Sequence, residues 1–515
     1  QTNIFNKETN LDFILKFDKE FGDVRIDGLA GANYRDYVYS SMYMAANDLT
    51  VPDLYTISNV KGNPSVSMYD SNKRTNSVYA AFNASYKDFL FLGVTGRNDW
   101  SSTLPADSRS YFYPSASLGF GITDAFNIDS KVLSYAKLRG SWAKVGGDTS
   151  PYQLSRTYSA GTFNSISLFT PTGTMPPIGL KPEETVSFEI GADMRFLNDR
   201  ISLDFTYYDQ TTVNQILSVA NSITTGYSAM KLNAGEIENK GVEVMLSGTV
   251  IDSPKGFKWD VTLNWAKNKN IVNKLYGDLQ SYRISNGFGG ATTVGIPGQE
   301  WGVIWGLPFV RNDEGKVVVG IDGIPLTTNS GTNLGNVNPD WTGGITNSFR
   351  YKGFNLNFLI DMRKGGDFFS CSAWHAYPTG TYEVTTANNV RETGLIVDGV
   401  KEDGTVNDIR VSAQDYFGGS WMWNNHEYSI LDGTYVKLRE VILGYDFNLE
   451  KVQWIQKLNV SFVGRNLALL YRDKSTDELG IDPEVGLGGG EAGVGFENFQ
   501  IPTTRNLGVK LSVSF

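Results

Sequence analysis

The feature that most constrains the fold is a strict alternation of apolar and polar residues along the chain. It is clearest between Val186 and Gln210, where two alternating segments flank a short turn at 197–200. The apolar positions there are Phe188, Ile190, Ala192, Met194, Phe196, Ile201, Leu203, Phe205 and Tyr207. Successive side chains of a strand point to opposite faces, so each segment has one apolar and one polar face. Each segment is about ten residues long, the length of a tilted strand that crosses a membrane.

The same pattern recurs along the chain. Alternation is evident at 257–265, in two segments joined by Lys352-Gly353, and in two joined by Lys87-Asp88. Further strands are expected near 11–18, 22–40, 112–123, 134–145, 235–250, 434–447 and 457–469. Together these segments predict about sixteen strands.

The connections between the segments alternate in length. Short turns are expected at 87–88, 197–200, 252–256 and 352–353, and long connections near 41–74, 98–111, 160–183, 271–297, 365–431 and 470–502. Tight turns on one side and long loops on the other are typical of outer-membrane barrels. The sequence therefore predicts an all-β fold, a transmembrane antiparallel β-barrel, in which 365–431 is a long extracellular loop region.

Composition excludes several other classes of protein. No apolar run reaches the roughly 18 residues that a spanning helix needs. The net charge is −10 and basic runs are absent, which argues against nucleic-acid binding. The single Cys371 excludes an intramolecular disulfide. A soluble β-sandwich or propeller remains the structural alternative, although its strands are usually shorter and a propeller would show a blade repeat.

The end of the chain is a further alternating segment. Its apolar positions are Leu507, Val509, Leu511, Val513 and Phe515, where the chain stops. A final amphipathic strand with a terminal aromatic residue is similar to the signal recognised by the outer-membrane assembly machinery. We therefore expect 503–515 to be a C-terminal strand that carries this signal.

Several motifs resemble those of SusC/RagA-type TonB-dependent outer-membrane transporters. They are Gly96–Pro105 (GRNDWSSTLP), Tyr111–Ser115, Leu180–Thr185, Asn233–Glu243, Asn338–Trp341, Gly464–Leu467, Gly480–Glu484 and Ile501–Arg505. They extend from about residue 90 to 515. Each motif is weak alone, but the set is specific to this family.

The resemblance implies a barrel of about 22 strands closed by an N-terminal plug. It also implies a SusD-like surface lipoprotein as a lid, energy supplied through TonB, and a host among the Bacteroidetes. Residues 1–515 would then be the C-terminal portion of the barrel. The plug and about six strands would lie upstream of Gln1, within a longer, exported precursor.

The function expected from this resemblance is active import of oligosaccharides across the outer membrane, without enzymatic activity. Import of peptides by the same machinery and a free-standing porin are the alternatives, and a soluble carbohydrate-binding β protein is a more distant one. Expected partners are the lipoprotein, TonB acting on the plug, outer-membrane lipid and the cargo. The resemblance is also compatible with a dimer of transporter–lipoprotein pairs.

No catalytic or metal-binding motif is recognisable. Both histidines, His375 and His426, fall in the 365–431 region and are expected on the loop surface. Carboxylates on the polar strand faces, such as Glu189 and Asp204, fit a lumenal wall better than a glycosidase pair. The acidic segment 477–484 could hold a structural Ca²⁺ in an extracellular loop, although its spacing differs from an EF-hand loop. No other cofactor is expected.

Loop aromatic residues are the best candidates for substrate binding, because flat aromatic faces stack on sugar rings and also bury apolar peptide side chains. The candidates are Trp100, Trp374, Tyr377, Trp421 and Trp423. The alternative interpretation is that they pack the loops or lie in the aromatic belt at the membrane interface.

Overall fold

A computed structural model describes residues 2–164, 166–447, 454–484 and 493–515. Within these ranges one sheet of sixteen strands dominates the fold, and fifteen of them follow one path. In order they are β1 (Thr2–Phe21), β2 (Val24–Ala45), β3 (Ser65–Tyr86), β4 (Leu90–Ser101), β5 (Ser110–Gly121), β6 (Leu133–Gly147), β10 (Glu183–Phe196), β11 (Ile201–Ala220), β12 (Ala229–Asp252), β13 (Phe257–Leu275), β19 (Trp341–Tyr351), β20 (Phe354–Lys364), β26 (Tyr435–Phe447), β27 (Lys457–Arg472) and β29 (Asn506–Ser514). The short β9 (Thr174–Met175) pairs with β12 in parallel.

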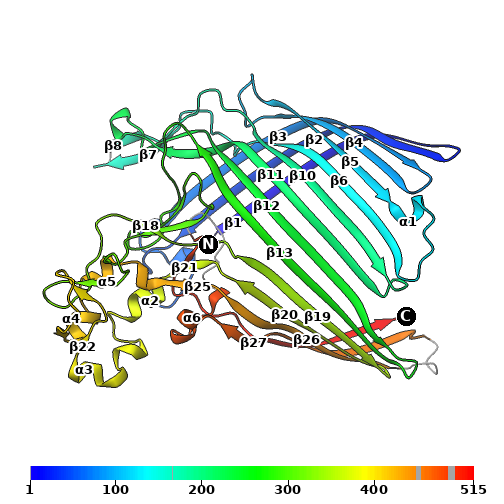
Figure 1. Ribbon diagram of the computed structural model, residues 1–515. Helices are drawn as coiled ribbons and strands as arrows, with labels where there is room; N and C mark the ends of the chain where they lie inside the picture. The colour runs from blue at the N-terminus through cyan, green and yellow to red at the C-terminus, as the bar shows by residue number, and fades with distance from the viewer. Residues whose placement is uncertain (1, 165, 448–453, 485–492) are drawn as a thin grey trace. The chain divides into compact units, whose positions relative to one another are not determined.

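The chain divides into two compact units. The first comprises Gln1–Ile128, Lys137–Ile190 and Asp209–Ile237. The second comprises Asp129–Ala136, Gly191–Tyr208 and Glu238–Phe515. In the first unit, β1 to β5 pair antiparallel, each with the next strand. In the second unit, the same holds along the order β13, β19, β20, β26, β27 and β29 (Figure 1).

The hairpins predicted at 352–353 and 87–88 are present. Lys352 and Gly353 have φ values of 48° and 87°, and Lys87 and Asp88 have φ values of 46° and 56°. Two consecutive residues with positive φ are the signature of the tight turn whose twist matches that of a β-hairpin. These turns fix the register of β19 with β20 and of β3 with β4.

Several strands are longer than expected. The segment 41–74, predicted as a long connection, contains the end of β2 and the start of β3, which pair from Val24↔Tyr86 to Ala45↔Ser65. The polar run from Asp70 to Arg74 has the composition of a loop, yet its backbone is fully paired with β2. The boundary predicted from local composition was wrong, because pairing with β2, rather than strand propensity, keeps these residues extended.

Aromatic rings cover glycines on neighbouring strands. A Cβ at Gly31 would lie 2.6 Å from Tyr79 Cζ, and one at Gly28 would lie 2.6 Å from Phe17 Cζ. The rings occupy the space that a side chain would need. Such cross-strand pairs are one of the devices that stabilise a curved sheet.

The segments between the wall strands carry their own structure. The strands there are β7 (Tyr158–Phe163), β8 (Ile166–Pro171), β14 (Tyr282–Ser285), β15 (Thr292–Gly295), β16 (Val303–Gly306), β17 (Val318–Val319), β18 (Thr332–Asn336), β21 (Asp367–Ser370), β22 (Leu395–Ile396), β23 (Val400–Lys401), β24 (Arg410–Val411), β25 (Ile430–Asp432) and β28 (Phe496–Glu497). The helices are α1 (Ile122–Ala125), α2 (Cys371–Ala376), α3 (Val390–Thr393), α4 (Ala413–Phe417), α5 (Trp421–Asn424) and α6 (Lys474–Glu478), with 3₁₀ turns at Ile57–Asn59, Ile223–Thr225, Glu383–Thr385, Ala387–Asn389 and Glu427–Ser429. None of the helices in the described ranges is long and apolar enough to cross a membrane.

Many of the best-buried apolar residues of the second unit lie in these segments. Phe368 and Phe369 of β21 and Phe496 of β28 are at most 1% exposed. β21 pairs with both β25 and β28, so the segment after β20 and the segment after β27 share one small sheet. The region 365–431, expected as a long loop, is therefore a structured element with its own core.

Candidate functional site

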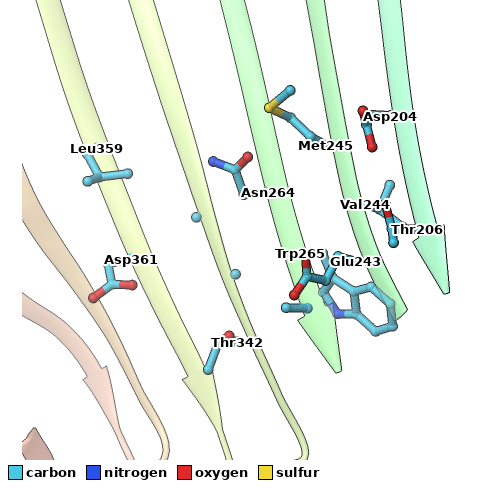
Figure 2. A pocket seen from close by; sticks show the side chains of 13 residues that line it. Asp204, Thr206, Glu243, Val244, Met245, Asn264, Trp265, Thr342, Leu359 and Asp361 are labelled. Atoms are coloured by element: carbon cyan, nitrogen blue, oxygen red, sulfur yellow. The ribbon is translucent and has the colours of Figure 1, made fainter. Parts of the chain in front are cut away.

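The polar face of the second unit contains a pocket of about 530 Å³. It is lined by side chains of β11, β12, β13, β19 and β20, and Figure 2 shows them at close range. Its polar members include the carboxylates of Asp204, Glu243 and Asp361, together with Thr206, Asn264 and Thr342. The pocket therefore offers hydrogen-bond acceptors and hydroxyl groups on the face that was predicted to be the lumenal wall.

The strand register explains why the wall is hollow at this point. Asn264 of β13, Gly344 of β19 and Asp361 of β20 stand opposite one another in a single row. Gly344 has no side chain, so nothing projects from β19 between the amide and the carboxylate, although Leu359 Cδ1 would lie 3.5 Å from a Cβ at this position. The next residue of the row is Lys437 of β26, which extends the polar line across a fourth strand.

A network of charges joins this row to the segment after β27. Lys437 Nζ lies 2.6 Å from Asp482 Oδ1 and 2.7 Å from Glu484 Oε2. Arg439 forms ion pairs with Asp361 and, at 3.0 Å, with Glu484. Thr503 donates to Asp482 across 2.7 Å. We call the set Lys437, Arg439, Asp482 and Glu484 the latch, because it holds the segment 473–484 against β26.

The cations set the protonation of the two latch carboxylates. Burial raises the pKa of the Asp482 carboxyl, but hydrogen bonds from Lys437 and Thr503 outweigh burial and hold this pKa below its ordinary value. Burial likewise raises the pKa of Glu484, and Arg439 and Lys437 more than offset it. Among the described residues no group of three His, Cys, Asp or Glu side chains is arranged to hold a metal. The structural Ca²⁺ considered for the segment 477–484 stays an untested prediction.

The motif Gly96–Pro105 forms a second network, in the first unit. Arg97 Nε donates to Asp99 across 2.8 Å, and the Tyr113 hydroxyl donates to the same carboxylate across 2.6 Å. Two positions further along the same strand face, Ser101 donates across 2.5 Å to Asp148, which also pairs with Lys73. The alternating residues of the motif therefore make a buried polar ladder between β3, β4 and β5, with Asp148 following β6.

Two of the predicted aromatic ligands are packed inside the loop region. Trp421 is 9% exposed, and its indole N–H donates to Tyr416 O across 2.8 Å. Tyr377 stacks on Phe417 and packs against the same hydrophobic cluster. Their placement favours the packing interpretation for both residues.

The other two loop candidates lie next to each other. Trp374 of α2 and Trp423 of α5 meet edge to face with ring centroids 5.0 Å apart. Trp374 packs on the cluster of Phe369 and Phe496, and its indole N–H donates to Met422 O. Trp423 is 38% exposed, so of the two it is the one whose ring a ligand can reach.

Trp100 lies at the end of β4 in the first unit, and it is 37% exposed. It is an even number of residues from Val94 and therefore occupies the same, apolar face of the strand. An exposed tryptophan at the end of an apolar strand face is typical of the membrane-interface belt.

The placement of His426 differs from the expectation of a loop-surface histidine. The residue is 2% exposed. Nδ1 accepts a hydrogen bond from the Leu307 amide at 2.9 Å, so Nε2 carries the proton, which it donates to Gly289 O at 3.0 Å. Burial lowers the pKa of His426, and the bond to Gly289 only partly offsets this. His426 is thus a neutral residue that ties three loop segments together, which loop composition could not reveal.

Comparison with known proteins decides between the remaining fold classes. Residues 1–467 match the family described as TonB dependent receptor-like, beta-barrel. The chain belongs to this family. Its sheet is therefore the wall of an outer-membrane TonB-dependent barrel, and the soluble sandwich or propeller is excluded.

Individual relatives agree with this assignment. The chain is 26% identical over 545 residues to TonB-dependent receptor P26 of Formosa agariphila, covering 99% of this chain and 53% of that protein. It is 26% identical over 438 residues to TonB-dependent receptor SusC of Bacteroides thetaiotaomicron, covering 79% of this chain and 41% of SusC. These relatives support the predicted SusC/RagA type. The chain spans about half the length of the curated relatives that it matches.

A solved structure confirms the fold. The structure of the RagAB peptide transporter superposes with a TM-score of 0.78 at 18% sequence identity, covering 99% of this chain and 56% of that chain. The same transporter in its open-open state gives a TM-score of 0.76. At this identity the similarity concerns the fold of the barrel.

Sequence reasoning missed the residues that organise the site. Lys437 and Asp148 are ordinary charged residues in the sequence, and nothing in their local pattern marks them as partners of distant segments. The one available signal was that Asp482 and Glu484 fall inside a family motif and therefore required an explanation.

Proposed function

We propose that this chain is the barrel portion of an active importer in the outer membrane, which works with a SusD-like surface lipoprotein and draws its energy through TonB. The match of residues 1–467 to the TonB-dependent receptor barrel carries the proposal. The similarity to SusC and the fold shared with RagAB support it further. No enzymatic step is part of this function.

We propose oligosaccharides as the cargo. The pocket on the polar face combines carboxylates, an amide and hydroxyl groups, which match the hydroxyl groups of a sugar. The loop region adds the exposed ring of Trp423. Sugars are commonly bound by this combination of hydrogen-bonding groups and a flat aromatic face.

Peptides are the second candidate, and a specific observation favours them. The structures with the highest similarity in fold described above are those of a peptide transporter. Carboxylates on the wall could also pair with the amino groups of a peptide. The two cargo classes therefore have to be separated by experiment.

The experiment uses the complete transporter together with its lipoprotein, purified as a complex. Binding is measured by calorimetry against a panel of oligosaccharides and a panel of peptides of mixed sequence. Saturable binding of an oligosaccharide is the expected result. Saturable peptide binding without any oligosaccharide binding would contradict the proposed cargo.

Uptake in cells tests the energy source. Cells that carry the complete transporter should accumulate the bound oligosaccharide only when TonB is present, because import against a gradient needs energy from the inner membrane. Uptake that persists without TonB would instead support a free-standing porin. A dimer of transporter–lipoprotein pairs can be tested on the same complex by its mass in solution.

A further inference from the structure

Three segments far apart in the sequence bring Trp423, His375 and Phe499 together in the second unit. His375 lies on α2, Trp423 on α5, and Phe499 follows β28. The imidazole meets Trp423 with centroids 5.3 Å apart at 77°, and it meets Phe499 at 4.9 Å and 63°. We call these residues the aromatic triad; His375 and Phe499 were not among the predicted site residues.

A buried carboxylate joins two of the three segments that carry the triad. Glu497 is 1% exposed, and its carboxylate accepts hydrogen bonds from the Ser370 and Ser372 hydroxyls, each at 2.7 Å. It also accepts from the Ser372 amide and from the Gln500 amide. One buried carboxylate thus fixes the start of α2 to the segment of Phe499. Two of the three rings are thus held in place before a ligand binds, which reduces the cost of binding there.

Phe499 combines exposure with backbone strain. Its side chain is 58% exposed, so it adds little to a core. Its φ is 53°, in the left-handed region that bulky residues rarely adopt. Glycine would accept this backbone without strain. A strained residue that holds an exposed ring is a feature associated with binding sites rather than with stability.

The hydrogen bonds of His375 leave an acceptor in the triad. Nδ1 lies 2.9 Å from Cys371 O, and a carbonyl only accepts, so Nδ1 carries the proton. Nε2 is therefore a lone-pair acceptor. Within the described residues it has no hydrogen-bond donor. The triad thus combines two exposed rings, each in contact with the imidazole, with an Nε2 that has no donor among the described residues.

We propose that the aromatic triad binds one pyranose ring of an oligosaccharide. The C–H face of the sugar would pack on Trp423 or Phe499, and one hydroxyl would donate to His375 Nε2. An aliphatic side chain of a peptide would bury Nε2 without a partner, which is unfavourable. This inference rests on the proposed function, because it locates a contact for the proposed class of cargo.

The test uses the complete transporter in a detergent without a sugar headgroup, and it measures saturation transfer by NMR. The probes are the methyl α- and β-glycosides of glucose, galactose and mannose. Saturation of ring C–H protons from at least one glycoside is expected. Phe499→Gly should reduce the signal, because any transfer that remains would come from the pocket on the polar face. The melting temperature should stay equal or rise, because glycine relieves the strain at φ 53°.

Two further variants separate the roles of the rings. His375→Phe keeps an aromatic ring but removes the acceptor, and it should weaken glycoside binding about tenfold, the loss expected for one hydrogen bond. Tyr55→Ala is the matched control, because it removes a ring that is 85% exposed in a different loop. It should change nothing.

The outcomes distinguish this site from the proposed function. Equal saturation transfer in Phe499→Gly and in the unmodified protein, or no transfer from any glycoside, would overturn the site while oligosaccharide import stays open. If the NMR signal depends on Phe499 but the transporter imports no oligosaccharide, the site is supported and the proposed function is overturned.

Discussion

Lys437 Nζ lies 2.6 Å from Asp482 Oδ1, which joins a lysine of the barrel wall to a carboxylate 45 residues further along the chain. The Lys437 side chain is only 4% exposed. A lysine buried to this degree requires ionic partners, since an unpaired charge is costly away from water. The latch therefore ties the end of the segment 473–484 to the wall.

Lys437→Met should release this segment. Removing Lys437 leaves the carboxylate of Asp482 without a cation, while Glu484 keeps its pair with Arg439. Breaking a buried ion pair in this way costs about 3–5 kcal/mol. Faster proteolysis and hydrogen exchange within 473–484 are the expected results. Lys474→Met is the matched control, because the side chain of Lys474 is 88% exposed and should contribute almost nothing. Equal protection in both variants would show that the latch does not hold the segment.

Acidification should loosen the loops around His426. The folded protein lowers the pKa of this histidine, so an opened state binds a proton first. The contribution of His426 is therefore complete above its ordinary pKa of about 6.5, and it declines as the pH falls below that value, by at most about 1.4 kcal/mol per pH unit. Protonation also removes the acceptor for the Leu307 amide.

Hydrogen exchange of the Leu307 amide measures this effect. After correction for the intrinsic pH dependence of exchange, protection should fall between pH 6.5 and 5 in the unmodified protein. His426→Gln cannot gain a charge in this range, so its protection should be lower but independent of pH. Protection that stays constant in the unmodified protein would contradict the prediction.

Gly31→Ala should impair assembly of the barrel wall. The added Cβ would lie 2.6 Å from Tyr79 Cζ, so the ring or the strands must move, at a cost of about 1–3 kcal/mol. A lower yield of folded barrel, seen as a loss of the heat-modifiable band in gel electrophoresis, is expected. Gly140→Ala is the control, because its Cβ would have one neighbour, Glu189 O at 3.8 Å. Combining Gly31→Ala with Tyr79→Ala should restore assembly in part.

Trp421→Ala and Trp423→Ala should have different effects on stability. Trp421 is 9% exposed and packs against Phe309 and Tyr416, so its removal should destabilise the loop region by about 3–5 kcal/mol. Trp423 is 38% exposed and should cost much less. Hydrogen exchange of α4 and α5 compares the two variants. A larger loss of protection in Trp423→Ala would reverse this assignment.

The barrel wall could be predicted from the sequence because alternation is a local property. In a strand such as β20, the alternation of apolar and polar residues identifies the two faces without reference to any other segment. Likewise, Lys352-Gly353 is recognisable as a tight turn from these two residues alone. Boundaries were less accurate where polar residues continue a paired strand, as from Asp70 to Arg74. There the pairing partner determines the structure, and a single segment does not contain that information.

The candidate site could be predicted only in part. The tryptophans of 365–431 were recognisable by residue type, but burial separates Trp421 from Trp423, and burial depends on α4 and α5 packing together. Phe499 gave no signal because its significance comes from a positive φ and from His375, which is 124 positions earlier in the chain (499 − 375). Contacts of this kind are set by the tertiary fold.

The pairing of β21 with β28 has a consequence for engineering. Phe369↔Phe496 and Ser370↔Glu497 bind together two loops that belong to different hairpins, so neither loop can be replaced independently. A graft that imports one of them from a relative would break the shared sheet and expose Phe368 and Phe369. Transplanting cargo preference between transporters of this type should therefore exchange both loops as one cassette, joined at β21 and β28.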